Sequence, residues 1–342
     1  MSQEDEDPGL HPRRTTALFG HEDAERTLLE AYQSGRMPHA WLIGGEPGIG
    51  KATLAYRMAR FVLAYPEPAM PEALRAASLA VDPDHPVARR VAGRAHSDLL
   101  TLERTLNERG KLRQSIAVDD VRRTVSFFGS TAGEGGWRVV IVDAVDDLNK
   151  ESANALLKVL EEPPRRSLML LVSHASGRVL PTIRSRCRML MLRPLPTEAV
   201  SNAAAGALDR APDDAELQAA AEAAGGSVAR ALSLLDGAAL ELRRQVLDLL
   251  ARLPQVDAKA LHALGDKLPV SDVDSLSAFM EAVNGWLSER LRDGEADLRR
   301  MARLASAWND INRRGREVEA FNLDRKPLVF SVFGQLADAA RG

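Results

Sequence analysis

One stretch of the 342-residue chain has the residue types and spacing that bind phosphate. Residues 45–51 read GEPGIGK and satisfy G-x-x-x-x-G-K, the pattern of a phosphate-binding loop, or P-loop. The glycines allow the backbone to curl so that successive N–H groups point at phosphate oxygens. Lys51 adds a positive charge toward the outer phosphates. The pattern therefore predicts a site for a nucleotide.

The residue after Lys51 departs from the pattern. A Ser or Thr at this position normally supplies the hydroxyl that ligates Mg²⁺, but the sequence has Ala52. Thr53 lies about 100° further round the expected helix, so its hydroxyl is a poor substitute. The loop therefore predicts ATP binding without hydrolysis.

The elements that position the loop are readable on both sides of it. The apolar run 40–43 predicts a strand, and residues 54–63 have helical periodicity. A later apolar strand, 137–143, ends in Asp143, which either holds Mg²⁺ through water or serves as a turn residue. Ala144 follows where ATPases of this type carry a glutamate base. The residues expected to bind the nucleotide are Gly45, Pro47, Gly48, Ile49, Gly50, Lys51, Ala52, Thr53 and Asp143.

The rest of the first half alternates strands with helices. This alternation predicts an α/β core with a parallel sheet covered on both faces, up to residue 193. Residues 1–18 are expected to be a loose arm. Residues 65–95, broken by prolines, are expected to be an insertion between core elements. The further strands are expected at 98–103, 167–174 and 189–192.

The remainder is predicted to be helical. Residues 197–236 indicate three short helices, with Gly225-Gly226 between the last two, and apolar stripes at helical spacing continue from Ala238. The sequence therefore predicts three domains. They are a P-loop core over 1–193, a small helical lid over 194–237 and an all-α domain over 238–342.

Composition excludes several classes of protein. The net charge of −3 gives no bulk attraction to nucleic acid or membranes, and no apolar run approaches the length of a membrane span. The single cysteine, Cys187, excludes an internal disulfide and a zinc site built from cysteines. The acidic start, MSQEDEDPG, is not a signal peptide. We therefore expect a cytoplasmic protein without zinc and without contact to a membrane.

Three further stretches add a family resemblance. Residues 39–43 (HAWLI), 154–164 (NALLKVLEEPP) and 185–187 (SRC), together with the P-loop, resemble the clamp-loader branch of the AAA+ ATPases. The resemblance covers about residues 19–236 well. It implies a RecA-like AAA+ core, a helical lid and a helical collar that joins five subunits in a ring. It also implies that Arg186 is an arginine finger, which reaches into a neighbour's ATP site. The alternative for Arg186 is a surface arginine paired with a carboxylate.

The chain departs from the hydrolysing members of this family at three positions. Their lid carries Gly-Ser-x-Arg, whose arginine senses the phosphates, but here Ala229 takes that place and Arg230 comes one residue late. Together with Ala52 and Ala144, this makes three losses on one nucleotide site. The polar residue at the end of the fourth strand, Ser173 or His174, leaves a further sensor ambiguous.

The resemblance implies a function in DNA replication. The chain would be a stator of the clamp loader of bacterial DNA polymerase III, would help load the sliding clamp on primed DNA, and would give Arg186 to a neighbour in a hetero-pentameric ring. The holoenzyme is a nucleotidyltransferase, whereas the isolated chain is not expected to be catalytic. One alternative is a hydrolysing motor subunit of the same complex. An autonomous helicase or repair ATPase is the other, and neither a basic stripe nor an aromatic base-stacking platform supports it.

Overall fold

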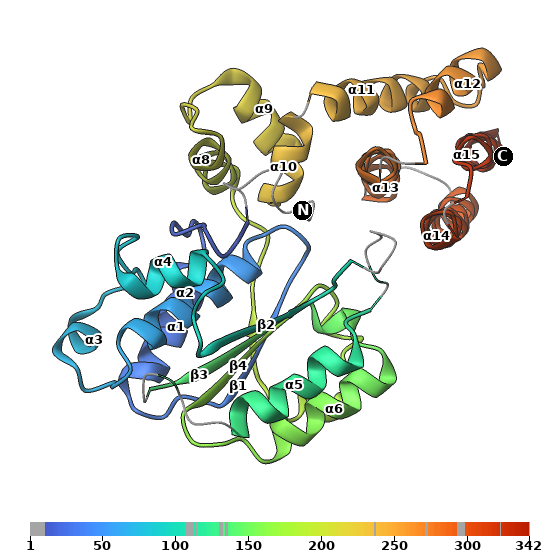
Figure 1. The fold of residues 1–342 in the computed structure, drawn as a ribbon. Helices are drawn as coiled ribbons and strands as arrows, with labels where there is room; N and C mark the ends of the chain where they lie inside the picture. Colours follow the sequence, from blue (N-terminus) through green and yellow to red (C-terminus); the bar gives the residue numbers. More distant parts are fainter. Residues whose placement is uncertain are drawn as a thin grey trace. The chain divides into compact units, whose positions relative to one another are not determined.

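The computed structural model describes residues 11–106, 113, 115–129, 133, 136–235, 237–270, 273–292, 298–321 and 323–341. The chain divides into two compact units, Met1–Ala231 and Leu232–Gly342 (Figure 1). Each unit has a hydrophobic core of its own, described separately below. Within the described segments, no helix is long and apolar enough to cross a bilayer.

The first unit is built on a five-stranded sheet in the order β2-β3-β4-β1-β5. Every neighbouring pair is parallel, so the carboxyl ends of all the strands meet at one edge of the sheet. This confirms the predicted α/β core, and each expected strand is present with its ends within a residue of the prediction. The strands are β1 (Ala40–Gly44), β2 (Leu99–Glu103), β3 (Arg138–Asp143), β4 (Ser167–Ser173) and β5 (Arg188–Met191).

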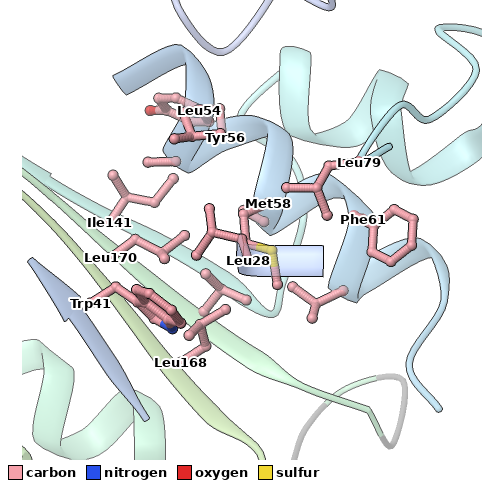
Figure 2. Close-up of a cluster of buried hydrophobic side chains, with 14 of the residues drawn as sticks. Leu28, Trp41, Leu54, Tyr56, Met58, Phe61, Leu79, Ile141, Leu168 and Leu170 are labelled. Atoms are coloured by element: carbon pink, nitrogen blue, oxygen red, sulfur yellow. The ribbon is translucent and has the colours of Figure 1, made fainter. Parts of the chain in front are cut away.

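Helices cover both faces of the sheet (Figure 1). Figure 2 shows Leu28 of α1 and Met58 of α2 packed toward Trp41 and Leu168 of the sheet. The opposite face packs against α5 and α6 in a second apolar cluster. Because β4 is buried on both faces along its whole length, its sequence is a continuous apolar run rather than an alternating one. The covering helices are α1 (Glu22–Gln33), α2 (Lys51–Ala64), α5 (Val118–Gly129) and α6 (Lys150–Glu161).

The arm that precedes α1 is not loose where the structure describes it, contrary to the prediction. Arg60 of α2 donates hydrogen bonds to the carbonyl oxygens of Arg13 and Thr15, at 2.9 and 2.6 Å. Arg57 donates to a third carbonyl of the arm. Charged guanidinium donors therefore hold residues 11–18 against α2. The first ten residues of the predicted arm lie outside the described part of the chain.

The insertion after α2 is tied to the core through a buried ion pair. Glu25 of α1 pairs with Arg57 of α2, and each side chain is only 11% exposed. The same carboxylate accepts a hydrogen bond from the backbone N–H of Leu79, at 2.9 Å. Within the predicted insertion, the chain forms two short helices, α3 (Pro71–Arg75) and α4 (Pro86–Ala92).

Helix α6 has clear start and stop signals. Asn149 caps its first turn, since the Asn149 side-chain oxygen accepts a hydrogen bond from the N–H of Ser152 at 2.8 Å. The helix ends at Glu161 because Pro163 and Pro164 cannot continue it. The short helix α7 (Pro181–Arg184) packs against α6.

Three helices follow β5, as the sequence predicts. Gly225 and Gly226 separate the last two with φ angles of 61° and 89°, which side chains rarely adopt. The boundary between the two compact units falls at Ala231/Leu232. The predicted domain limits at 193/194 and 237/238 remain predictions. The three helices are α8 (Thr197–Leu208), α9 (Ala215–Ala223) and α10 (Val228–Leu235).

Every element that the structure describes in the second unit is a helix. The predicted apolar stripes are buried in it, including Val246 of α11 and Phe279 and Val283 of α13. Asn284 of α13 is hydrogen-bonded to α14: its side-chain oxygen accepts from the indole N–H of Trp308 at 2.7 Å and from the side-chain amide of Asn312 at 2.9 Å. The helices are α11 (Gly237–Ala251), α12 (Ala258–Asp266), α13 (Val273–Arg292), α14 (Leu298–Phe321) and α15 (Lys326–Arg341).

Candidate functional site

The P-loop connects the carboxyl end of β1 to the start of α2. Three of its glycines have positive φ: 150° at Gly45, 75° at Gly48 and 98° at Gly50. Gly50 is the last residue before α2, which begins at Lys51. The loop therefore curls at the amino end of a helix, where backbone N–H groups and the helix dipole favour anions. This is the placement that the sequence predicts.

Lys51 is folded back onto the loop. Its side chain is buried, and the residue is only 3% exposed. The Nζ atom donates a hydrogen bond to the carbonyl oxygen of Gly45 at 2.8 Å and another to the carbonyl oxygen of Glu46. Burial lowers the pKa of Lys51 to about 8, and the negative charge of Asp143 partly opposes that shift. The loop's own carbonyls therefore hold the ammonium group that a phosphate would otherwise contact.

Asp143 lies at the end of β3, on the same edge of the sheet as Lys51. Burial raises the pKa of the Asp143 carboxyl, while His174, when its ring is protonated, and the positive charge of Lys51 act to lower it. The structure thus brings together the carboxylate and the lysine that the sequence selected. Ala144, which follows Asp143, is buried at 2% exposure.

Asp146 is engaged elsewhere. Its carboxylate accepts a hydrogen bond from the hydroxyl of Ser173 at 3.1 Å and from the backbone N–H groups of His174 and Ala175 at 2.6 and 3.2 Å. These bonds order the chain directly after β4. Asp146 therefore serves the loop that follows β4, and the hydroxyl of Ser173 is committed to Asp146.

The lid contacts the P-loop at Gly48. The backbone N–H of Ala229, in the first turn of α10, donates a hydrogen bond to the carbonyl oxygen of Gly48 at 3.2 Å. A Cβ atom added to Gly48 would lie 2.8 Å from the Cβ of Ala229 and closer still to the Oγ of Ser227. Two lid residues thus face the loop: Ser227, with a neutral hydroxyl, and Ala229, which has no polar side chain.

Sequence reasoning missed one residue of the site, His21. This side chain is buried before α1, and its Nε2 atom lies 2.6 Å from the carbonyl oxygen of Ile49 in the P-loop. Burial lowers the pKa of His21, so the ring is neutral at pH 7 and donates its Nε2 proton to that carbonyl. In the sequence, the one signal for this residue was the position of the histidine directly after Gly20. The structure shows that Gly20 has a positive φ.

Arg186 lies outside the P-loop site of its own chain. It follows α7, and its side chain is 35% exposed. Its Nη2 atom pairs with Oε1 of Glu161 at 2.8 Å, and its Nη1 atom donates to the carbonyl oxygen of Thr182 at 2.9 Å. A longer bond of 3.4 Å joins Nη1 to the hydroxyl of Ser185. In the single chain, Arg186 is therefore a surface arginine that is paired with a carboxylate.

The site is better suited to binding phosphate than to binding the Mg²⁺ that ATP hydrolysis requires. Positive-φ glycines, a helix amino terminus and Lys51 are the donors that phosphate binding needs. The donors for Mg²⁺ are incomplete, because Ala52 has no hydroxyl and the oxygens of Asp146 accept hydrogen bonds from the chain.

The fold and the site together define an AAA+ P-loop protein: the P-loop follows β1 inside a parallel sheet, and a helical lid contacts it. The family model described as "DNA polymerase III, delta subunit" matches residues 20–196. The DNA polymerase III subunit delta' of Pseudomonas aeruginosa is 34% identical over 235 residues, which cover 68% of this chain and 67% of that protein. The chain belongs to the family of DNA polymerase III delta' subunits, within the clamp-loader branch of the AAA+ proteins.

Other relatives align over different shares of their length. The subunit delta' of Escherichia coli is 34% identical over 171 residues, which cover 50% of this chain and 47% of that protein. The DNA polymerase III subunit tau of Salmonella typhimurium is 27% identical over 335 residues, covering 97% of this chain and 46% of that protein. The chain thus spans about half the length of these two relatives.

Proposed function

We propose that this chain is the stator of a DNA polymerase III clamp loader. In this role it sits in a hetero-pentameric ring with gamma/tau and delta subunits, helps load the sliding clamp on primed DNA, and does not hydrolyse ATP itself. The observation that carries the proposal is Ala52 in the first turn of α2, directly after the buried Lys51. No oxygen is available there for the Mg²⁺ that phosphoryl transfer requires.

ATP binding without turnover is the second part of the proposal. The curled loop and Lys51 provide the phosphate contacts. For a phosphate to be bound, the Nζ atom must leave the carbonyl oxygens of Gly45 and Glu46, which hold it now. Ala229 offers no charge from the lid. A nucleotide bound here would therefore lack the charged lid contact that an arginine at position 229 would give, and we expect weak binding.

The third part assigns Arg186 as a finger that acts in trans. Its guanidinium is partly exposed at the end of α7 and is held by residues 161, 182 and 185, not by the P-loop. A guanidinium that reaches a neighbour's γ-phosphate stabilises charge in the transition state, an effect worth about 10³–10⁵-fold in rate in other phosphoryl-transfer systems.

Steady-state ATPase assays of the reconstituted loader, with sliding clamp and primed DNA, test all three parts. We expect no turnover by this chain alone, high turnover by the complex, and a loss of about 10³-fold or more at the neighbouring site with Arg186→Ala. Arg184→Ala is the matched control, because Arg184 is exposed on α7 two residues away. Assembly of each variant is checked by size-exclusion chromatography. Full activity of an intact Arg186→Ala complex would refute the finger role.

The alternative is a hydrolysing motor subunit, and similarity to a tau subunit over 97% of this chain favours it. That function needs a hydroxyl near Lys51, and Thr53 is the nearest candidate. Robust ATP turnover by the purified chain, abolished by Thr53→Ala and by Lys51→Ala, would establish the motor function and overturn the stator.

A further inference from the structure

We propose that Glu161 is a positioning residue that restrains Arg186 and opposes its engagement with a neighbour's phosphate. This inference rests on the proposed role of Arg186 as a finger acting in trans. It concerns the resting state of that finger, in which its charge is already paired within its own chain.

The restraint is built from two elements that pack together. Glu161 is the last residue of α6, and Arg186 directly follows the turn that ends α7. The 2.8 Å ion pair is joined by the hydrogen bond from Nη1 of Arg186 to the carbonyl oxygen of Thr182. One carboxylate and one backbone carbonyl thus hold two different nitrogens of the guanidinium, which fixes its orientation.

The position of Glu161 indicates that it does not serve the helix that carries it. The carboxyl end of a helix carries partial negative charge, so a carboxylate in the last turn is repelled there. Lys or Arg is the favourable choice at such a position. The Glu161 side chain is nevertheless half-exposed and turned onto Arg186. The ion pair with Arg186 therefore accounts for a negative charge at the end of α6, where the helix itself disfavours one.

The direction of the effect follows from charge alone. If the guanidinium leaves Glu161 to reach a phosphate, the ion pair must break. If instead the guanidinium stays paired and binds the phosphate with its remaining N–H groups, two anions contact the same guanidinium and repel each other. In both cases Glu161 disfavours the engaged finger. Removing its charge must therefore favour engagement.

The size of the effect is set by exposure. The pair is partly open to solvent, with Arg186 35% and Glu161 51% exposed. Exposed ion pairs contribute little, so neutralising Glu161 is expected to raise the affinity of the neighbouring site for ATP by about 1.5- to 5-fold.

The test uses the reconstituted loader with Glu161→Gln, which keeps the shape and the acceptor but removes the charge. The readouts are the affinity for fluorescent mant-AMP-PNP, the KM for ATP, and kcat with clamp and primed DNA. We expect tighter analogue binding and a lower KM by about 1.5- to 5-fold, with kcat unchanged, because saturating ATP already displaces the restraint. Glu162→Gln is the matched control, since Glu162 is the exposed next residue. It should leave all three values unchanged.

A double mutant separates this role from a structural one. In an Arg186→Ala background, Glu161→Gln should have no effect, because its partner is gone. Unchanged or weaker analogue binding by Glu161→Gln, while Arg186→Ala still lowers turnover at the neighbouring site, would overturn the restraint and leave the finger intact. If neither variant changed activity in an assembled loader, the finger itself would be refuted. A Glu161→Gln effect that persists without Arg186 would assign Glu161 to the packing of α6.

Discussion

Replacing Gly48 by Ala should push the lid away from the P-loop. Two costs arise from the structure. The φ of +75° is unfavourable for any residue with a Cβ, at about 1–2 kcal/mol. The new methyl would also lie 2.8 Å from the Cβ of Ala229, which is attached to the helix backbone and cannot rotate aside. Overpacking of this kind costs about 1–3 kcal/mol, and the weakened hydrogen bond from Ala229 adds about 0.5–1.5 kcal/mol.

Gly35→Ala is the control that isolates the backbone term. Gly35 has a φ of +69°, and a Cβ there would meet nothing within 4 Å. It should lose only about 1–2 kcal/mol, whereas Gly48→Ala should lose about 2.5–6.5 kcal/mol in total. In a unit of this size the difference lowers the melting temperature by at least about 3 °C. Calorimetry measures both variants, and limited trypsin digestion reports exposure of the lid.

Equal melting temperatures for the two variants would refute the reasoning. They would mean that Ala229 in α10 does not pack on Gly48 in solution. A faster tryptic cut within the lid of Gly48→Ala, with the Gly35→Ala lid as resistant as wild type, is the expected pattern.

Three further predictions concern the charges and caps that hold the site. Glu25→Ala leaves the guanidinium of Arg57 buried without its carboxylate and should cost about 3–5 kcal/mol in urea unfolding, while Asp23→Asn, at an exposed position on the same helix, should change little. The pKa of Lys51 is about 8 in the folded chain but 10.5 when exposed, so the unfolded chain holds the proton longer and stability should rise with pH from about 8, by roughly 3 kcal/mol at most. The measurement is the free energy of unfolding of wild type and of Lys51→Met at several pH values from 7 to 9.5. A constant difference between the two proteins over that range would contradict this prediction. Asn149→Ala should cost about 1 kcal/mol through loss of the α6 cap, measured by the urea midpoint.

Local patterns were enough to predict the sheet and the P-loop. The strands β1, β3 and β4 are nearly continuous apolar runs because they are buried on both faces, and that signal does not depend on distant residues. The end of α6 was readable because Pro163 and Pro164 cannot continue a helix. The glycine spacing of the loop likewise predicts where the backbone needs a positive φ, and the structure shows positive φ values at Gly45, Gly48 and Gly50.

The contacts between side chains distant in sequence were not predictable. Arg60 looked like an ordinary helix residue, yet it fixes the arm that precedes α1. Arg186 could have pointed in several directions, and its choice of Glu161 depends on how α6 and α7 pack. The inward fold of Lys51 depends on the burial of its side chain. Such features follow from three-dimensional packing, which a single sequence does not encode in any short pattern.

The strand order has a consequence for how the chain is made on the ribosome. β1 pairs with β4 and β5, so Ala40 must wait for Met169 to be synthesised before its backbone is paired. At about 5–20 residues per second this delay is roughly 6–25 s. During that interval the apolar segment AWLIG of β1 has no partner strand. The P-loop then starts from a strand that is not yet held in a sheet. We expect nascent chains to need shielding by a chaperone at this stage, with the nucleotide loop taking shape only after β4 has emerged.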